Sequence, residues 1–249
     1  MPLSKIKFVY NEPAMVIRAG KIPYLVIGDL HIGVERSLHE RGVHVFNATE
    51  FMADRIKNIM KEFSLKKIIM LGDIKESVLY PDVSAARAIK GFFDNLSAFE
   101  ITIVAGNHDA HLADIINLPI TKELLIGSFA LLHGEKNPSE KAMLSDYLIT
   151  AHNHAMVRIR DSNGATYDQK VWLMAKLNQA GAHRSYGNVN KSIKLIMMPA
   201  FNSLIMGSEL SKFYKENANP SLRNKTFNYG SAEIYNLMGQ RIDPKTVLR

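Results

Sequence analysis

Five short segments of the chain carry side chains that could bind metal ions or transfer protons. They are Asp29 and His31, then Asp73, then Asn107, His108 and Asp109, then His133, and finally His152 and His154. A single Asp or Asn of this kind would be unremarkable, because backbone turns favour both residues. Five such segments are harder to explain as turns, because buried polar groups are costly unless they are paired or bind a metal. The pattern therefore predicts a metal site.

Seven of these side chains are candidate metal ligands: Asp29, His31, Asp73, Asn107, His133, His152 and His154. Their mixture of carboxylate and amide oxygens with imidazole nitrogens suits Mn²⁺, Fe²⁺, Zn²⁺ or Ni²⁺ better than Ca²⁺ or Mg²⁺. Seven ligands are too many for one tetrahedral zinc ion, whereas two ions roughly 3.5–4 Å apart would use them all. Two metal ions at this separation bind the attacking and leaving oxygens of an in-line displacement. The sequence therefore predicts two divalent transition metal ions as cofactors.

Spacing and charge add to this prediction. One residue separates Asp29 from His31, and one separates His152 from His154. In an extended segment, residues two apart point to the same side, so each pair is expected to present its ligands together. The formal charges of two divalent ions, two carboxylates and a bridging hydroxide sum to roughly +1, which would attract a phosphoryl group.

The first three segments follow predicted buried strands. These strands cover Tyr24–Gly28, Lys67–Leu71 and Ile101–Ala105. Helical patterns lie between them, the first capped by Asn47 or Thr49 and the second by Ser84. The alternation of strand and helix is typical of right-handed parallel crossovers, and the continuous apolar runs indicate strands that are covered on both faces. Ligands of such sheets gather at the carboxyl ends of the strands, which is where the polar groups lie.

The other strand patterns predict a second, more antiparallel sheet. A hairpin over Lys7–Tyr10 and Met15–Arg18 precedes the first crossover. Later strands are expected over Leu124–Leu132, Tyr147–Ala151, Met156–Arg160, Lys170–Ala175, Ile193–Met198 and Glu233–Leu237. We therefore expect an α/β fold with two mixed β-sheets packed face to face and flanking helices, a four-layer α/β/β/α sandwich. One domain is expected over residues 1–249, with a metal-site half over about 20–155 and a sheet-rich half over about 156–249.

Composition narrows the class of protein. The 249 residues include no cysteine, which excludes disulfides, zinc–thiolate clusters and thiol catalysis. The formal net charge of +7 favours polyanionic partners such as nucleic acid or nucleotides. The opening residues do not resemble a signal peptide and no apolar run is long enough to span a bilayer, so we expect a cytoplasmic protein without a membrane partner. The segment 156–194 mixes basic residues with Tyr167, Trp172 and Tyr186, and it could form either a wall that binds a nucleic-acid strand or a solvated hairpin face.

Five motifs, read in order, resemble those of the calcineurin-like metallophosphoesterase superfamily. They are Gly-Asp-Leu-His (Gly28–His31), Gly-Asp-Ile-Lys-Glu (Gly72–Glu76), Gly-Asn-His-Asp (Gly106–Asp109), His-Gly (His133–Gly134) and Ala-His-Asn-His (Ala151–His154). The stretch Leu195–Gly207, with Met-Pro-Ala-Phe-Asn, and the closing Leu-Arg are similar to a subgroup of small microbial phosphoesterases that includes the DNA-ligase-associated enzymes. Ala151 and Ala155 depart from the family, which usually has Gly and often Pro at these positions.

The resemblance implies a role for each residue. The first ion would be held by Asp29, His31 and His154, and the second by Asn107, His133 and His152, with Asp73 bridging the two. His108 would be the general acid that protonates the leaving oxygen, with Asp109 fixing its tautomer. The nucleophile would be a hydroxide that bridges the metals. Glu76 would support Asp73 or a neighbouring loop, and Lys75 would either bind substrate phosphate or be an ordinary solvated lysine.

These residues and the resemblance together predict a binuclear metal-dependent phosphoesterase, first of all a phosphodiesterase acting on nucleic acid or cyclic nucleotides. A phosphomonoesterase or a nucleotide pyrophosphatase would use the same ions and stays open as an alternative. A third hypothesis is a protein without catalytic activity that keeps the fold as a binding scaffold. Such a protein would be expected to have lost metal ligands, whereas all seven are present here. Mn²⁺ is the leading candidate metal, with Fe, Zn or Ni as alternatives. The sequence does not indicate an oligomeric state.

Overall fold

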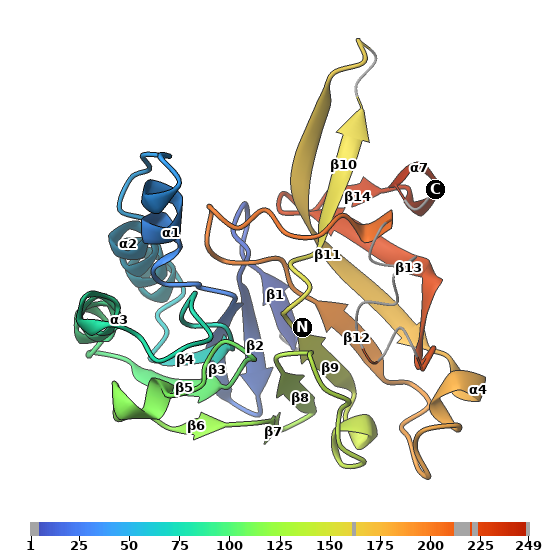
Figure 1. Cartoon of the computed structure of the whole chain (residues 1–249). Helices are drawn as coiled ribbons and strands as arrows, with labels where there is room; N and C mark the ends of the chain where they lie inside the picture. Colours follow the sequence, from blue (N-terminus) through green and yellow to red (C-terminus); the bar gives the residue numbers. More distant parts are fainter. Residues whose placement is uncertain (1–4, 161–162, 212–219, 221–223, 248–249) are drawn as a thin grey trace.

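The chain forms two β-sheets in a computed structural model that describes residues 5–160, 163–211, 220 and 224–247 (Figure 1). The first sheet has six strands in the order β1-β2-β3-β4-β5-β6. They are β1 (Ile6–Phe8), β2 (Met15–Ala19), β3 (Ile22–Gly28), β4 (Lys67–Leu71), β5 (Glu100–Val104) and β6 (Ile120–Thr121). The first three strands pair antiparallel, and β3 to β6 pair parallel. The carboxyl ends of β3, β4 and β5 therefore lie side by side, as predicted.

The second sheet has eight strands, in the order β14-β13-β11-β12-β9-β8-β7 with β10 paired to β11. They are β7 (Leu124–Ile126), β8 (Phe129–Leu132), β9 (Tyr147–Thr150), β10 (Met156–Arg160), β11 (Thr166–Leu177), β12 (Lys194–Met197), β13 (Phe227–Asn236) and β14 (Arg241–Ile242). Strands β8, β9 and β12 are parallel neighbours, whereas the other pairs are antiparallel. Both sheets are therefore mixed, as predicted.

Helices cover the outer faces of the two sheets. They are α1 (Val34–Glu40), α2 (Ala48–Glu62), α3 (Val83–Asn95), α4 (Gln179–Ala182) and α7 (Pro244–Val247), with 3₁₀ turns η1 (Leu112–Asp114) and η2 (Ala142–Leu144). Figure 1 shows α1, α2 and α3 together on the side of the first sheet that faces away from the second. The second sheet is covered on its outer face by shorter pieces, including η2, α4 and α7. None of the described helices is long and apolar enough to cross a membrane.

Three apolar layers hold this arrangement together. Along β3, Leu25 and Ile27 pack against Met52 of α2 and its neighbours, while Val26 between them faces the second sheet. The layer between the sheets includes Trp172, which is buried. A third layer packs the outer face of the second sheet against η2, α4 and α7. The expected four-layer sandwich is therefore confirmed, because side chains alternate between the two faces of each buried strand.

Local signals placed several element boundaries and missed others. Strand β13 begins six residues before its predicted start at Glu233, and β6, β14, α4 and α7 were not predicted. The side chain of Asn47 caps α2 by accepting from the Glu50 amide, one of the two predicted caps. Helix α3 is capped by Asp82 and not by Ser84, because the Asp82 carboxylate reaches the Ala85 amide. The single strand predicted over Leu124–Leu132 is two, because a turn containing Gly127 at a φ of 57° divides it into the hairpin β7–β8. The short helix α1 was not predicted.

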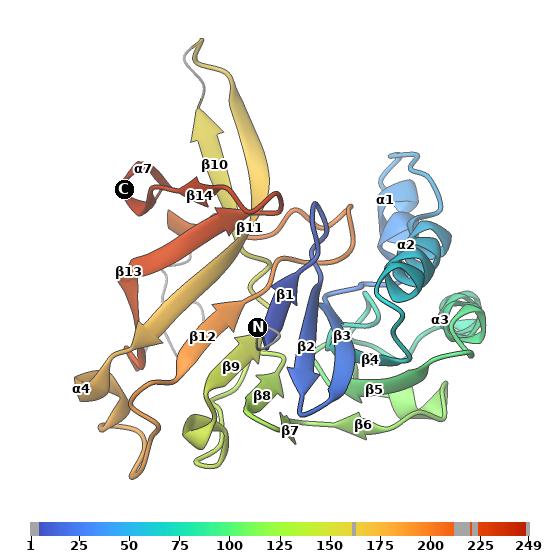
Figure 2. The same cartoon turned by 180° about the vertical axis from the view of Figure 1, so that it is seen from behind.

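Strand β11 is the longest of the described strands and extends beyond its predicted range. Its first half pairs with β10, and the two form a hairpin that projects from the body of the molecule (Figure 2). Its second half pairs with β12 and β13 inside the sheet. One uninterrupted strand therefore belongs to both the projecting hairpin and the core.

Candidate metal centre

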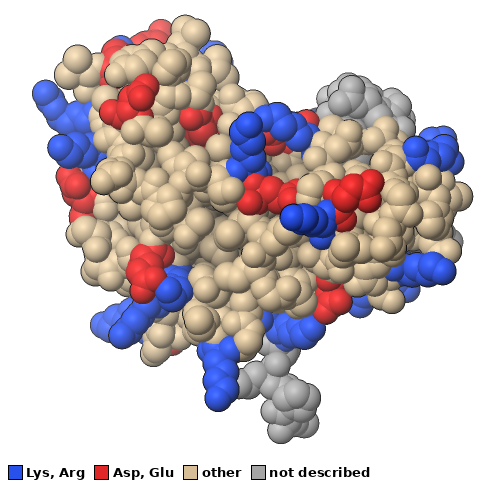
Figure 3. Space-filling model, turned by 90° about the horizontal axis from the view of Figure 1, so that it is seen from below, with Lys and Arg blue, Asp and Glu red and all other residues tan. Residues whose placement is uncertain are grey.

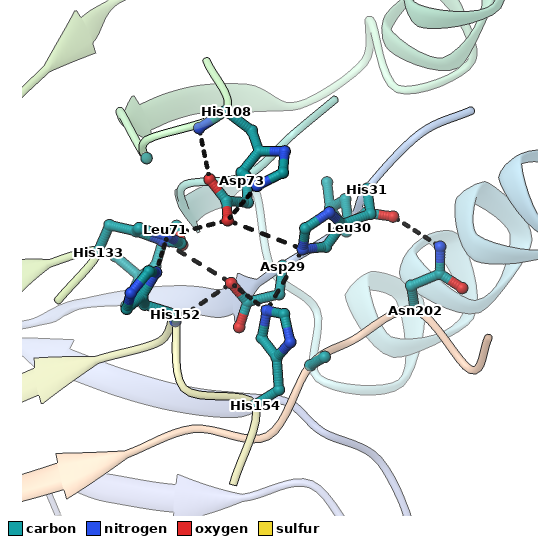
Figure 4. A network of polar contacts seen from close by, with 12 residues as sticks. Asp29, Leu30, His31, Leu71, Asp73, His108, His133, His152, His154 and Asn202 are labelled. Carbon is teal, nitrogen blue, oxygen red and sulfur yellow. Dashed lines mark hydrogen bonds and ion pairs between the residues drawn. The ribbon is translucent and has the colours of Figure 1, made fainter. Parts of the chain in front are cut away.

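Six predicted ligands, carried by the loops after four strands, converge in one space (Figure 4). Asp29, Asp73 and His133 follow β3, β4 and β8. His31 lies three residues after the end of β3, and His152 and His154 lie two and four residues after the end of β9. Three of the ligands belong to the first sheet and three to the second, so the centre lies at the junction of the two sheets. The seventh predicted ligand, Asn107, follows β5 in the neighbouring loop, and its side chain is exposed.

The backbone at these ligands is unusual. The φ angles are 57° at Asp29, 44° at His31, 48° at Asp73, 65° at His152 and 45° at His154. All five lie in the left-handed region, which Asp, Asn and His enter more readily than other non-glycine residues. The prediction that the ligand pairs sit on extended segments is therefore wrong, although the side chains of each pair do converge. Tight left-handed turns, and not a strand-like alternation, direct them towards the centre.

Two glycines allow the loops to approach one another. A Cβ atom at Gly72 would lie 2.4 Å from Nδ1 of His133, and one at Gly106 would lie 2.3 Å from Oδ1 of Asp73. Real Cβ atoms essentially never make contacts this short. Glycine is therefore required at both positions to bring the ends of β4, β5 and β8 into one site.

One group of ligands gathers around Asp29. Its Oδ1 atom lies 3.3 Å from Nε2 of His154, and that nitrogen lies 3.3 Å from Nε2 of His31. The other oxygen, Oδ2, is buried and has no hydrogen-bond partner among the described residues. A buried carboxylate oxygen without a partner is costly unless a cation binds there. The three residues thus present ligand atoms around one point.

A second group gathers around Asp73. Its Oδ2 atom lies 3.2 Å from Nε2 of His133, and this Nε2 lies 3.2 Å from Nδ1 of His152. The same Oδ2 lies 3.8 Å from Nε2 of His31, a member of the first group. The other oxygen of Asp73 accepts the backbone amide of His108 at 2.9 Å, which fixes the orientation of the carboxylate. One carboxylate oxygen is therefore shared between the two groups.

The donor set fits a pair of divalent ions. Bonds of about 2.0–2.2 Å to one ion place its ligand atoms about 2.8–3.6 Å apart, and the ligand contacts of 3.2–3.3 Å lie in this range. Two of these contacts join the nitrogens of two imidazole rings, an arrangement better explained by a shared cation than by a hydrogen bond between the rings. Asp29, His31, Asp73 and His154 form one possible metal-binding group, and Asp73, His133 and His152 form another.

The charges within the centre shift the acid–base equilibria of its members. Burial alone would raise the pKa of Asp73, but its hydrogen bond to His133 and the nearby imidazoles hold this pKa well below its ordinary value. Burial alone would lower the pKa of His133, but the contact with Asp73 and the charge of Asp29 raise it to about 9. The pKa of His152 is lowered, first by burial and then by the charge of His133. Positive charge is thus favoured beside Asp73, on the ring of His133, and disfavoured on the ring of His152.

Residues around the ligands fix their orientation. The Nδ1 atom of His31 lies 2.8 Å from Oε2 of Glu76, and Nδ1 of His133 lies 2.9 Å from the carbonyl oxygen of Leu71. Each contact leaves the Nε2 atom of the ring directed towards the centre. Glu76 was expected to support Asp73 or a neighbouring loop, and its carboxylate instead contacts the ligand His31. The motif Gly-Asp-Ile-Lys-Glu identified Glu76 as a residue of the site, but it did not indicate that the Glu76 carboxylate would contact His31.

His108 lies beside the ligands, and its tautomer is fixed differently from the prediction. Its Nδ1 atom contacts the backbone carbonyl of Glu76, and its Nε2 atom lies 4.0 Å from Oδ2 of Asp73. The hydrogen bonds of the Asp109 carboxylate go elsewhere than to the His108 ring. Its two oxygens accept the backbone amides of Ile74 and Gly106, each at 2.8 Å. Asp109 therefore joins the loops after β4 and β5, and the expectation that it orients His108 is wrong.

Lys75 is buried, and its ammonium group donates to the carbonyls of Ser77 and Leu79, the latter at 3.1 Å. Burial lowers its pKa. Neither the expected phosphate contact nor the solvated alternative matches this arrangement, because the charged end stabilises the loop that follows the motif.

The basic segment 156–194 does not form a continuous aromatic wall. Trp172 and Tyr186 are buried, which leaves Tyr167 as the exposed aromatic side chain of the three. Arg158 forms a two-point ion pair with Asp168. Figure 3 shows another face, where Lys and Arg are spread among Asp and Glu and do not gather in one basic patch.

Solved structures of other proteins resemble this chain to different degrees. The structure is similar to that of the nuclease MPE of Pseudomonas putida, with a TM-score of 0.57 and 15% identity over 94% of this chain and 97% of that one. The phosphoesterase Yfce of E. coli is also similar, with a TM-score of 0.36 and 18% identity over 56% of this chain and 74% of that one. The metallophosphoesterase of Sphaerobacter thermophilus gives a TM-score of 0.32 and 15% identity over 72% and 77%.

Among curated protein sequences, none matches this chain. A family model described as calcineurin-like phosphoesterase matches residues 22–189, which span more than half of the chain and contain all seven predicted ligands. The protein therefore belongs to the calcineurin-like phosphoesterase family and is a metal-dependent phosphoric ester hydrolase.

Proposed function

We propose that this protein is a binuclear phosphodiesterase that hydrolyses a P–O bond in nucleic acid or nucleotides, with Mn²⁺ as the leading candidate metal. The observation that carries the proposal is the position of Oδ2 of Asp73. This atom lies 3.2 Å from Nε2 of His133 and 3.8 Å from Nε2 of His31, so it is within reach of both ligand groups. A carboxylate in this position suits the bridge of a two-ion site.

In this proposal the first ion is held by Asp29, His31 and His154, and the second by His133, His152 and Asn107. When bound, the two ions would polarise the phosphoryl oxygens and lower the pKa of water, so that a nucleophile is available near neutral pH. Asn107 would have to turn its exposed side chain inward to complete the second set.

His108 is the proposed general acid. Its side chain is one-quarter exposed, so a substrate oxygen can reach it. The Nε2 atom of the ring faces the ligands, 4.0 Å from Oδ2 of Asp73. The Glu76 carbonyl contact at Nδ1 keeps a proton on that nitrogen. Protonated His108 would therefore donate the Nε2 proton to the leaving oxygen as the P–O bond breaks.

Two observations support the choice of a diester substrate. One structurally similar protein is described as a nuclease, and the net charge of +7 favours polyanions. A phosphomonoester or a nucleotide pyrophosphate would use the same ions. Initial rates on matched aryl mono- and diesters, measured with Mn²⁺, separate these alternatives. A strong preference for the monoester would refute the diester assignment.

The mechanism is tested by removing the proposed bridge. Protein stripped with EDTA should recover diester hydrolysis when Mn²⁺ is added, and Asp73→Asn should abolish it. The control is Asp94→Asn, the same change at an exposed carboxylate in the last turn of α3, which should leave the rate unchanged. Robust hydrolysis by the Asp73→Asn protein would overturn the proposed bridging role.

A further inference from the structure

The Met-Pro-Ala-Phe-Asn motif, residues 198–202, has no part in the chemistry described above, yet its last two residues contact the loop that carries Asp29. The amide of Phe201 donates to the carbonyl of Gly28 at 2.9 Å, and the amide of Asn202 donates to that of Asp29 at 3.4 Å. The Asn202 side chain is fully buried and donates to the carbonyl of Leu30 at 2.7 Å (Figure 4). Three consecutive carbonyls around Asp29 are thus bound by two residues of the motif.

The opposite edge of the motif is bound by two basic side chains. Nζ of Lys170 donates to the carbonyls of Ala200 and Asn202 at 2.7 and 2.5 Å. Nη1 of Arg55 donates to the carbonyl of Phe201 at 3.1 Å, and the guanidinium group lies 4.2 Å from the centre of the Phe201 ring. Glu12 pairs with the remaining nitrogens of Arg55, which fixes that side chain in turn. Every carbonyl of residues 200–202 therefore has a basic donor.

Asp29 has a particular need for this support. It combines a left-handed backbone with a fully buried side chain, one of whose oxygens has no hydrogen-bond partner among the described residues. Such a conformation persists only where the surrounding structure holds it. Residues 200–202 make no hydrogen bond to Asp73, His133 or His152 within the described part of the chain. The support is therefore directed at one of the two ligand groups.

We propose that Lys170 and Arg55, acting through residues 200–202, are positioning residues that hold Asp29 in place for the first metal ion. Neither side chain touches the ligands, and their effect passes through two layers of hydrogen bonds to the Asp29 backbone. Outer partners of this kind typically change metal affinity by about 10–100-fold when they are removed. The inference rests on the proposed function in one respect, the role of Asp29 as a ligand of the first ion.

The test is a count of tightly bound Mn²⁺ ions by equilibrium dialysis, which does not depend on hydrolysis. Lys170→Met keeps an unbranched side chain only one atom shorter but removes both hydrogen bonds, and a cavity of about 300 Å³ beside Lys170 and Arg55 leaves room for adjustment. We expect this variant to keep one tight ion and to bind the other about 10–100-fold more weakly. Arg55→Met should have the same effect, and Lys170→Arg, which retains the donors, should restore much of the lost affinity.

The matched control is Lys176→Met, the same change at an exposed lysine on the same strand, which should bind two ions as the wild type does. Two ions bound with wild-type affinity by Lys170→Met would overturn this inference alone. An equal loss of both ions that Lys170→Arg does not restore would also overturn it, because that result indicates general unfolding. A wild-type protein that binds fewer than two ions would refute the proposed function itself, and with it this inference.

Discussion

Gly106 has no room for a side chain, so its replacement by alanine tests whether the position of Asp73 controls activity. A Cβ atom at Gly106 would lie 2.3 Å from Oδ1 of Asp73 and 2.4 Å from its backbone nitrogen, whereas ordinary contacts begin at 3.4 Å. One of the two residues must therefore move by about 1 Å, an amount that can cost on the order of 10²-fold in rate. Rotation of the Asp73 side chain cannot relieve the clash, because the backbone nitrogen is also in the way.

We expect Gly106→Ala to lower kcat/KM for an aryl phosphodiester with Mn²⁺ by about 100-fold or more, with a far-UV circular dichroism spectrum close to that of the wild type. The control is Gly91→Ala within α3, where a Cβ atom would meet nothing within 4 Å. This change should leave activity unchanged and raise the free energy of unfolding by about 0.5–1 kcal/mol, because alanine is the better helix former. A Gly106→Ala enzyme within roughly tenfold of the wild-type kcat/KM would refute the reasoning.

Three further predictions concern the residues around the ligands. Glu76→Ala removes the partner of His31, so Mn²⁺ affinity measured by calorimetric titration should fall about 10–100-fold, and an unchanged affinity would contradict the role given to Glu76. Asp109→Ala leaves the amides of Ile74 and Gly106 without their acceptor, so urea denaturation should show a loss of about 1–3 kcal/mol for each amide that stays buried and unpaired. Burial and the charge of Arg55 lower the pKa of Lys170 from its ordinary value of 10.5 to about 7. Between these two values the unfolded chain binds the extra proton, so the free energy of unfolding of the wild type should rise with pH relative to Lys170→Met from about pH 7 to 10. A difference that does not depend on pH would show that Lys170 titrates normally.

The sequence was sufficient for the sheet architecture and for the location of the site. Buried strands such as Lys67–Leu71 are visible as apolar runs, and parallel connections bring their carboxyl ends together whatever the details of the loops. Asp29, Asp73 and His133 follow from those two facts. Their assignment to two ions needed the resemblance, because spacing alone left the division open.

The polar contacts between loops could not be predicted in the same way. Asp109 neighbours His108 in the chain, yet its oxygens bind amides in two different loops, and adjacency in sequence carries no information about such partners. Lys75 shows the same limit, since its burial depends on how the loop from Ser77 to Leu79 folds back over it. The left-handed backbone of the ligands was also missed, because the apolar pattern of a strand ends just before it.

That backbone limits which residues each ligand position can accept. Asp, Asn and His offer oxygen or nitrogen donors, and they are also the non-glycine residues that most readily adopt a φ near 50°. A β-branched replacement such as Asp29→Val would remove the donor atom and also oppose the turn that directs it, whereas glycine would keep the turn and lose only the donor. Saturation mutagenesis at Asp29, His31, Asp73, His152 and His154 should therefore separate the two requirements. Variants with glycine would retain folded, metal-poor protein, and variants with valine or isoleucine would lose the loop conformation as well as the ion.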